Sequence, residues 1–373
     1  MTPSTAGRPT LPATTPLPAL DTAGAFALQQ RLVAATCASL PGEALFRADV
    51  GVVPGLGRPE TTARVERVLA EALGAEDACL VQGAGTGAIR AALSAGPWRE
   101  GERRLLLHDA PDYSTTATTF RDALVEPVRV DMDDADAIAA ALADPASPRW
   151  VYVQHTRQRL SDAFNPMDVV ALAREHGRRV VVDENYAVVR TPGIGVEHGA
   201  AASAFSLFKL HGPEGVGVVL GDADVVAAAH AANYSGGGQV QGHQAIAALQ
   251  ALVSAPLNWA RQSEEVYRLA EALRAGAVPG IADAAVANVQ DLCVVALLET
   301  PTADDVRRRA AENGAAPYPV GSNSRYEIAP MVYRMSSSTL EAQPELRDWT
   351  LRINPMRASA DLVVDILRRS LAA

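Results

Sequence analysis

Residues 179–209 read RVVVDENYAVVRTPGIGVEHGAAASAFSLFK, and two charged groups in this stretch decide the fold. The run RVVVD is typical of a buried strand that ends in Asp183, and a carboxylate at the carboxyl end of a parallel strand points into the crevice of the sheet. Lys209 lies among the apolar residues Phe205, Leu207, Phe208 and Leu210, where loss of solvation lowers a lysine pKa and prepares the amine as a nucleophile. The alternative interpretation of the two groups is an ordinary ion pair.

Short β-rich runs and alanine-rich helical runs alternate along the chain around this stretch. Strands are expected at 78–82, 104–108, 150–154, 179–183, 204–208 and 217–220, and helices at 28–40, 61–73, 86–95, 115–123 and 167–175. Such alternation is the signature of β-α-β units that feed a parallel sheet. We therefore expect an α/β fold with a mostly parallel sheet.

The C-terminal part predicts a smaller α+β unit. Strands are expected near 293–298 and 351–353, and helices at 303–313 and 360–371. A long helical pattern after Gly242 meets Pro256, which predicts an interruption and a hinge between two lobes. The expected organisation is a flexible lead-in (1–18), an N-terminal segment that packs with the small domain (19–45), a large domain (46–255) and a small domain (256–373).

A glycine-rich motif, GAGTGA at 83–88, follows an expected strand and opens an expected helix. Backbone N–H groups at such a helix start, freed by glycine from side-chain crowding, cradle a phosphate. The motif alone fits a dinucleotide-binding fold with Asp109 as the ribose-binding acid, another phosphate cofactor, or a tight turn. The candidate phosphate-binding residues are Gly83, Ala84, Gly85, Thr86 and Gly87.

Composition excludes several classes of function. Asp and Glu number 43 against 33 Lys and Arg, for a formal net charge of −10, so nucleic acid is not an expected partner. The longest apolar stretches are far shorter than the roughly 20 residues of a membrane-spanning helix, so no membrane partner is expected. The amino terminus lacks a signal-peptide pattern, and the three cysteines are widely separated, which favours a cytoplasmic protein. No metal-ligand spacing is present, so no metal is expected.

The glycine motif, Asp183 and Lys209 together are the groups that pyridoxal 5'-phosphate (PLP) requires. The lysine forms a Schiff base with the aldehyde, the aspartate keeps the pyridine nitrogen protonated, and the helix start holds the phosphate. From about Phe46 to the C-terminus the sequence resembles the fold type I PLP-dependent enzymes, the aspartate-aminotransferase-like superfamily. This resemblance implies a fold type I PLP-transferase, in which a mostly parallel central sheet carries helices on both faces and a smaller α+β domain follows.

Two segments look like the class V branch of that superfamily. Residues 206–220, SLFKLHGPEGVGVVL, look like its lysine region, which implies that Ser206 reaches the phosphate. Residues 234–242, YSGGGQVQG, are similar to the segment that crosses to the partner subunit's cofactor, which implies a homodimer with Tyr234 and Gly237 at the shared site. The phrases VQGAGTGAIRA, HDAPDY, VQHTRQ, NYAV and PYPVG look like a little-characterised bacterial group of YhfS-type proteins.

Five further residues are expected around the cofactor and the substrate. The resemblance implies that Tyr113 stacks on the pyridine ring and that Arg352, in LRINP, binds a substrate carboxylate. His155 ends an expected strand beside the ring position, where it would bind the phenolic oxygen or move protons; a structural histidine is the alternative. Tyr186 is a candidate for the cofactor edge, with a tyrosine that faces the core as the alternative, and Arg157 is a weaker candidate for the substrate carboxylate.

The expected function is that of an aminotransferase that binds PLP through Lys209 and acts on an amino acid or amine. A PLP-dependent lyase, of the elimination or replacement type, is the enzymatic alternative, because the same cofactor frame supports several reactions. A third hypothesis is a regulator or scaffold that binds PLP without catalysis, but the sequence has no DNA-binding motif that would support it. A dehydrogenase of the dinucleotide-binding fold leaves Asp183 and Lys209 unexplained.

Overall fold

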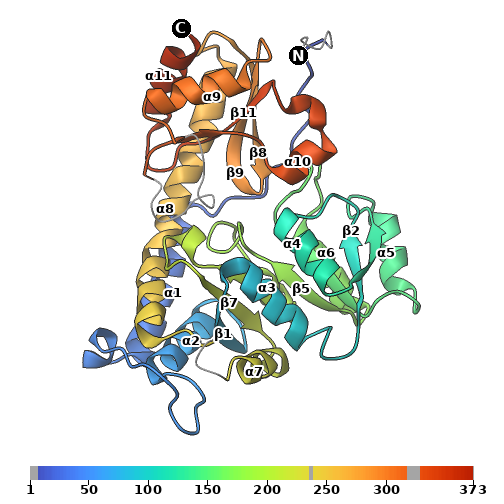
Figure 1. The fold of residues 1–373 in the computed structure, drawn as a ribbon, viewed down its shortest axis with the longest axis vertical. Coiled ribbons are helices and arrows are strands. Elements are labelled where there is room, and N and C mark those ends of the chain that lie inside the picture. Colours follow the sequence, from blue (N-terminus) through green and yellow to red (C-terminus); the bar gives the residue numbers. More distant parts are fainter. Residues whose placement is uncertain (1–6, 235–237, 317–327, 373) are drawn as a thin grey trace.

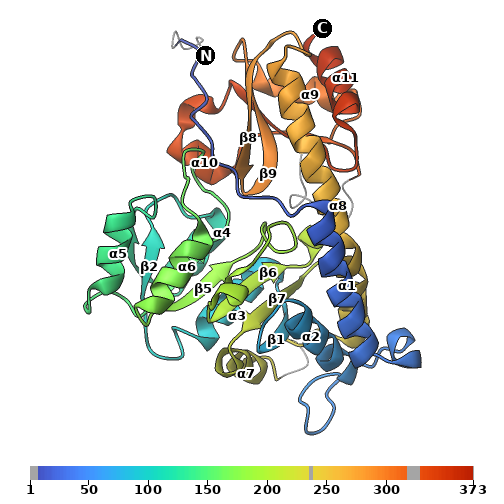
Figure 2. The same cartoon turned by 180° about the vertical axis from the view of Figure 1, so that it is seen from behind.

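The computed structural model describes residues 7–234, 238–316 and 328–372. Two sheets form two lobes, and the long helix α8 (Gly242–Arg274) runs from one lobe into the other (Figure 1). The termini of the described chain both lie at the lobe of the smaller sheet (Figure 2). This is the mixed α/β architecture that the alternating sequence pattern predicts.

The large sheet has seven strands in the order β1-β7-β6-β5-β4-β2-β3. Its strands are β1 (Asp77–Gln82), β2 (Arg104–His108), β3 (Glu126–Val130), β4 (Trp150–Gln154), β5 (Arg179–Asp183), β6 (Ala202–Ser206) and β7 (Val216–Gly221). Strands β3, β2, β4, β5 and β6 run parallel, and β7 runs antiparallel to both of its neighbours. The sheet is therefore mostly parallel, as expected.

Helices cover both faces of this sheet because alternate strand residues point to opposite sides. Val81 packs in the core beneath α3 (Ala84–Ala95), α4 (Ser114–Asp122) and α7 (Ala223–Ala232), whereas its neighbour Leu80 packs beneath α2 (Glu60–Ala72) on the other face. Val151 and Val153 pack beneath α5 (Ala135–Ala143) and α6 (Pro166–Glu175). Strands buried on both faces leave their carboxyl ends as the place for a site.

Helix α8 corrects the expected interruption at Pro256, because the helix is continuous for 33 residues with this proline inside it. The proline lacks one backbone N–H, but apolar residues on both sides of it are held in core packing that offsets the lost bond. Trp259 belongs to the core of the large domain, and Val266 to that of the small domain. The helix thus changes cores several residues after Pro256.

The small domain is built on an antiparallel sheet of order β10-β11-β9-β8. Its elements are β8 (Ile281–Val289), β9 (Asp291–Leu298), α9 (Ala303–Glu312), β10 (Met331–Tyr333), α10 (Ser337–Ala342), β11 (Thr350–Asn354) and α11 (Ala360–Leu371). The expected strands at 293–298 and 351–353 are confirmed within β9 and β11. Short 3-10 turns complete the chain at Gly42–Phe46, Gly195–His198, Phe208–Leu210 and Pro344–Leu346.

The N-terminal segment lies differently from the expectation. The described part of the lead-in runs along β8, where Thr14 Oγ1 donates to the carbonyl of Val286 and Asn288 Oδ1 accepts from the N–H of Leu17. Helix α1 (Thr22–Ser39) instead buries Leu28 and Leu32 in the core of the large domain. The segment that packs against the small domain is therefore the lead-in, whereas helix α1 packs against the large domain. Among the described helices, none is long and apolar enough to cross a membrane.

Candidate active site

A cavity of about 160 Å³ opens at the carboxyl ends of the parallel strands. It brings together Asp183, Lys209, Tyr113 and the start of α3, segments that are far apart in the sequence. Its described lining residues are Ala84, Gly85, Thr86, Ile89, Tyr113, Thr115, Gln154, Thr156, Asp183, Asn185, Tyr186, Phe208, Lys209 and Gln290. The expected strand-terminal aspartate and apolar-flanked lysine thus share one site.

The start of α3 is shaped by glycine. Gly83 has φ +95°, which permits the sharp turn from β1 into the helix. A Cβ on Gly85 would lie 2.0 Å from Asn185 Oδ1, so only glycine lets the helix approach the end of β5 this closely. No side chain caps the helix, and its first turn carries no acid, so its N–H groups remain suited to an anion. Of the expected cradle, Ala84, Gly85 and Thr86 line the cavity, and Gly83 and Gly87 form the turn behind it.

Asp183 is a buried carboxylate held by three donors. Its Oδ1 accepts from the backbone N–H of Asn185 at 3.0 Å and from Asn185 Nδ2 at 2.7 Å, and its Oδ2 accepts from the Tyr152 hydroxyl at 3.2 Å. Burial raises the pKa of Asp183 above its usual value, and these hydrogen bonds together with the charge of Lys209 oppose the rise. The group is positioned to form a buried ion pair with a cationic partner in the cavity.

Lys209 is the one lysine among the 373 residues. It lies in the 3-10 turn Phe208–Leu210, where Arg190 donates to its carbonyl oxygen at 2.8 Å and its Nζ lies 3.9 Å from the centroid of the Tyr186 ring. Burial lowers the pKa of Lys209 to about 8, against the opposing charge of Asp183. A large fraction of the amine is therefore neutral at mildly alkaline pH, the state in which it is a nucleophile.

Ser206 and Tyr113 complete the fit to a phosphate-bearing aromatic ligand. The Ser206 Oγ is buried without a hydrogen-bond partner among the described residues, as expected of a group that binds a ligand. Tyr113 lines the cavity at the start of α4, and burial raises its pKa. The glycine cradle, the unpartnered hydroxyl and the Asp183–Lys209 arrangement together fit PLP.

The expectation for His155 needs correction, because its ring points away from the cavity. Gln154 pairs with Asp183 across β4 and β5, and residues paired in this way present their side chains on the same face. His155, one residue later, turns to the opposite side, where its Nδ1 lies 2.6 Å from Glu184 Oε2 and both groups are buried. Gln154 and Thr156 line the cavity instead.

The two arginine candidates differ. Neither of them is among the described lining residues of the cavity, and the Arg157 guanidinium donates to the carbonyl oxygens of Asp162 and Ala163 in its own loop. Arg352 is buried and ion-paired with Asp291, and burial lowers its pKa to about 10. Its partner Asp291 follows Gln290, which lines the cavity, so Arg352 lies behind the cavity wall.

The sequence did not predict the residues that reach the cavity because of strand pairing or because they come from the small domain. Gln154 and Tyr152 could have been found from strand alternation, once β4 is placed beside β5 in register. Gln290 had no such signal, because it comes from a hairpin of the small domain that the sequence did not predict.

Comparisons with known proteins agree with this geometry. The family model for aminotransferase class I and II matches residues 45–290. The chain belongs to the aminotransferase class I and II family. A second model, for the YhfS-like C-terminal domain, matches residues 267–367 of this family member. The chain is 44% identical over 361 residues to the uncharacterised protein YhfS of Escherichia coli strain K12, which covers 96% of the chain and 99% of that protein.

Solved structures show the same fold for this class I and II family member. The crystal structure of the pyridoxal-5'-phosphate dependent protein YhfS from Escherichia coli matches with a TM-score of 0.93 at 43% identity, over 97% of this chain and 99% of that one. The cystathionine γ-lyase CalE6 from Micromonospora echinospora matches with a TM-score of 0.73 at 20% identity, over 93% and 99% of the two chains. The second likeness concerns the fold alone. The expected fold type I architecture is confirmed.

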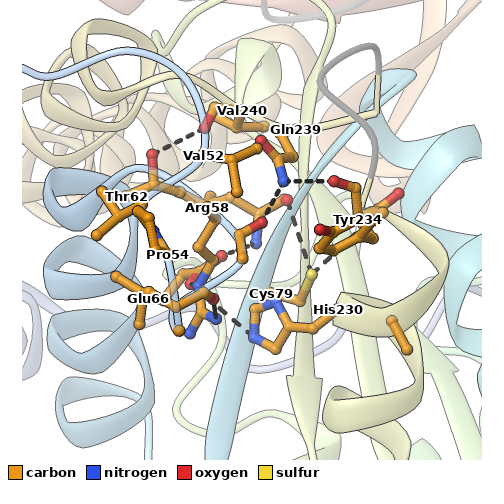
Figure 3. A pocket seen from close by; sticks show the side chains of 17 residues that line it. Val52, Pro54, Arg58, Thr62, Glu66, Cys79, His230, Tyr234, Gln239 and Val240 are labelled. Atoms are coloured by element: carbon orange, nitrogen blue, oxygen red, sulfur yellow. Dashed lines mark hydrogen bonds and ion pairs between the residues drawn. The ribbon is translucent and has the colours of Figure 1, made fainter.

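A second, larger cavity of about 360 Å³ lies away from Lys209, between the loop 52–58 and the end of α7 (Figure 3). Tyr234, expected at the partner's cofactor, lines it and is 68% exposed. Gly237 lies outside the described residues. Since this cavity contains neither Asp183 nor Lys209, its larger size does not make it the reaction site of this family member.

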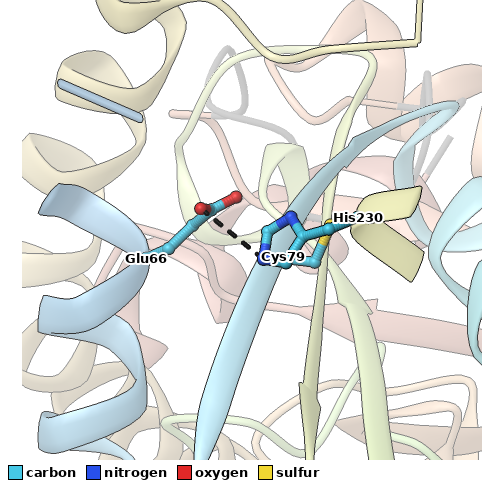
Figure 4. A group of neighbouring side chains, drawn as sticks. All are labelled: Glu66, Cys79 and His230. Atoms are coloured by element: carbon cyan, nitrogen blue, oxygen red, sulfur yellow. Dashed lines mark ion pairs between the residues drawn. The ribbon is translucent and has the colours of Figure 1, made fainter. Parts of the chain in front are cut away.

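Three potential metal ligands meet beside that cavity, a grouping that the sequence spacing did not show. Glu66, Cys79 and His230 offer ligand atoms within 4.8 Å of one another (Figure 4). Glu66 is already paired with Arg58 at 2.5 Å, and His230 Nε2 bonds the carbonyl of Ala78 at 3.1 Å. Burial raises the pKa of Glu66 to about 7. We assign no metal to this cluster, because protein groups already occupy its ligand atoms.

Proposed function

We propose that this chain is an aminotransferase that uses PLP to move the amino group of an amino acid. PLP is its cofactor by family and by the fit of the site. The observation that carries the proposal is the place of Lys209: the one lysine of the 373 residues is buried in a cavity with a strand-terminal aspartate and an uncapped, glycine-rich helix start. An amine in those surroundings is placed to react with a ligand in the cavity.

The residues that would hold the cofactor divide by chemical group. Lys209 would bind the aldehyde, Asp183 would pair with the ring nitrogen, and Tyr113 would stack on the ring. The phosphate would be bound by the start of α3, through Gly85 and Thr86, and by the free hydroxyl of Ser206. When bound, PLP withdraws electrons from the substrate Cα and so weakens the bonds to that carbon.

Proton movement at the substrate falls to Lys209. Burial lowers the pKa of its amine to about 8, so the neutral form that can accept the Cα proton is present near neutral pH. The Tyr186 ring beneath Nζ limits where the amine can move. Arg190, which bonds the carbonyl of Lys209, keeps the lysine backbone in place while the side chain moves.

The substrate is an amino acid with an α-carboxylate, bound on the Arg352 side of the cavity. Arg352 is a buried cation of the small domain, and its partner Asp291 adjoins Gln290 on the cavity wall. A carboxylate there would be drawn by its guanidinium. Arg157 has no part in this proposal, since its Nε and Nη2 donate to the carbonyl oxygens of Asp162 and Ala163 in its own loop.

The active unit of the proposal is a homodimer. Phe46, Val50 and Tyr234 expose 85%, 71% and 68% of their surface, and such large apolar side chains favour contact with a second copy of the chain. The segment from Tyr234 to Gly242 would then approach the partner's phosphate. A cytoplasmic location and the absence of a nucleic acid partner stay predictions.

Absorption spectra of the purified, PLP-loaded protein test the function. We expect an amino acid from a panel of twenty to bleach the cofactor band, with release of the matching keto acid and no ammonia. A keto acid and ammonia in equal amounts, without an amino acceptor, would assign the lyase reaction instead. A spectrum that no amino acid changes would overturn the proposal.

A further inference from the structure

The cavity around Lys209 receives one side chain from the small domain. Of its described lining residues, Gln290 alone follows α8, and every other lies between positions 84 and 209. Gln290 is 3% exposed, and its Nε2 has no acceptor among the described residues. A buried amide donor without a partner is costly in a dry protein interior. Its place on the cavity wall therefore points to an acceptor that arrives with a ligand.

The backbone at Gln290 is held in an unusual conformation. Gln290 forms the tip between β8 and β9, where Val289 and Asp291 are paired directly across the hairpin. Its φ of +72° lies in the left-handed region, which a glutamine adopts rarely and at a cost of order 1–3 kcal/mol. Glycine would relieve this strain, so the presence of glutamine indicates that its side chain is used.

The next residue fixes the tip in position. Asp291 is 1% exposed and accepts hydrogen bonds from the Tyr333 hydroxyl at 3.1 Å and from Asn354 Nδ2 at 3.0 Å. It also forms the ion pair with Arg352. Three contacts from β10 and β11 thus anchor the hairpin, and Gln290 points from a rigid base into the cavity.

The same ion pair changes what Arg352 can do. Asp291 already offsets the charge of the guanidinium, although the Arg352 Nε has no acceptor among the described residues. A second carboxylate near that pair meets the negative charge of Asp291 as well as the positive charge of Arg352. The pair therefore attracts a substrate carboxylate less strongly than a lone arginine would, and a further donor strengthens its recognition.

We propose that Gln290 is a substrate-binding residue whose side-chain amide donates to the α-carboxylate, while Asp291 and Arg352 form the pair that positions it. This inference rests on the proposed function and deepens it, since it assigns the carboxylate end of the substrate to the tip of the β8–β9 hairpin. The group selected is a carboxylate because an amide donor bonds a charged acceptor more strongly than a neutral one.

Two aminooxy compounds test the proposal without knowledge of the natural substrate. Aminooxyacetate carries a carboxylate, O-methylhydroxylamine carries none, and the aminooxy nitrogen of each displaces Lys209 from the cofactor with a change in absorbance. The second-order rate constant of this change is measured for the PLP-loaded wild type, Q290G and Q290E. Asp283→Ala, which removes an exposed side chain from the same hairpin, is the matched control.

For Q290G we expect the rate constant with aminooxyacetate to fall by about 10- to 100-fold, the value of a hydrogen bond to a charged group. With O-methylhydroxylamine the fall should stay below about threefold. The melting temperature of Q290G should equal or exceed that of the wild type, because glycine accepts φ +72° without strain. D283A should match the wild type with both compounds.

Q290E keeps the size of the side chain and places a negative charge at the tip. Its rate constant with aminooxyacetate should fall further than that of Q290G. With O-methylhydroxylamine the rate constants of the two variants should be similar. Equal losses with both compounds, or no loss in either variant, would overturn the role of Gln290. A wild-type protein that responds to neither compound would instead overturn the proposed function.

Discussion

The Tyr152 hydroxyl donates to Asp183 Oδ2 at 3.2 Å, from a strand position two residues before the Gln154 that pairs with Asp183 in register. The bond joins β4 to the end of β5 beneath the cavity. It is one of the contacts that favour the ionised form of Asp183 and oppose the rise of its pKa on burial. A proton on Asp183 would remove the negative charge that is proposed to pair with the pyridine nitrogen of PLP.

Tyr152→Phe should therefore shift the acid limit of the enzyme to higher pH. Loss of the donor raises the pKa of Asp183 further, so the carboxylate takes up its proton at a higher pH than in the wild type. The shift is expected because a hydrogen bond to the charged form of Asp183 is lost. The measurement is the pH dependence of the cofactor absorbance, with Tyr267→Phe, an exposed tyrosine on α8, as the control. If the absorbance changes at the same acidic pH in the variant and the wild type, Tyr152 does not influence the pKa of Asp183.

The buried amine of Lys209 should leave a mark on the stability of the apoprotein. Its pKa is about 8 in the fold and 10.5 in a solvated lysine, so between these values the unfolded chain binds more protons. Stability then rises with pH through this window, and the burial penalty is complete below about pH 8. We expect the wild type to gain about 3 kcal/mol relative to Lys209→Met between pH 8 and 10.5.

Urea unfolding of the two apoproteins across this range measures the difference directly. Borohydride reduction of the loaded wild type should also place the pyridoxyl group at Lys209, and K209M should carry none. A constant difference in unfolding free energy across the window would show that the amine is not buried as described.

Much of the fold was open to prediction because alternation and helical periodicity depend on local residues. Strands β1, β2, β4 and β5 and the place of Lys209 follow from such patterns. The direction of His155 did not, since it depends on which residue of β4 pairs with Asp183. Pro256 misled for a related reason: packing against two cores, a tertiary effect, overrides the local preference of one residue.

Gln154 and His155 offer a direct comparison between the cavity and the opposite face. Gln154→Ala should weaken cofactor binding while the melting temperature changes little, because its side chain lines the cavity and is partly exposed. His155→Ala should lower the melting temperature, since it leaves buried Glu184 without its 2.6 Å partner, at a cost of about 1–3 kcal/mol. Fluorescence titration with PLP and thermal unfolding measure the two effects. If His155→Ala instead weakened PLP binding and Gln154→Ala lowered the melting temperature, His155 would be a cofactor-binding residue.

Arg352 and Asp291 should behave as one unit in stability measurements. Arg352→Ala alone leaves a buried carboxylate uncompensated and should cost about 3–5 kcal/mol. The double variant Arg352→Ala, Asp291→Ala should be more stable than this single variant, because no buried charge is left alone. A double-mutant cycle of unfolding free energies gives the coupling. Additive effects would mean that the two groups do not interact in solution.

Exposed apolar side chains test the proposed homodimer. Phe46→Arg places a charge where 85% of a phenyl ring is exposed, and should convert a dimer to a monomer in sedimentation experiments. If residues from Tyr234 onward complete the partner's phosphate site, the monomer should also bind PLP more weakly by about tenfold or more, the value of one hydrogen bond to a charged group. Leu362→Arg, at a half-exposed position on α11, is the control and should change neither property. A fully loaded, active monomer of F46R would show that each chain carries a complete site.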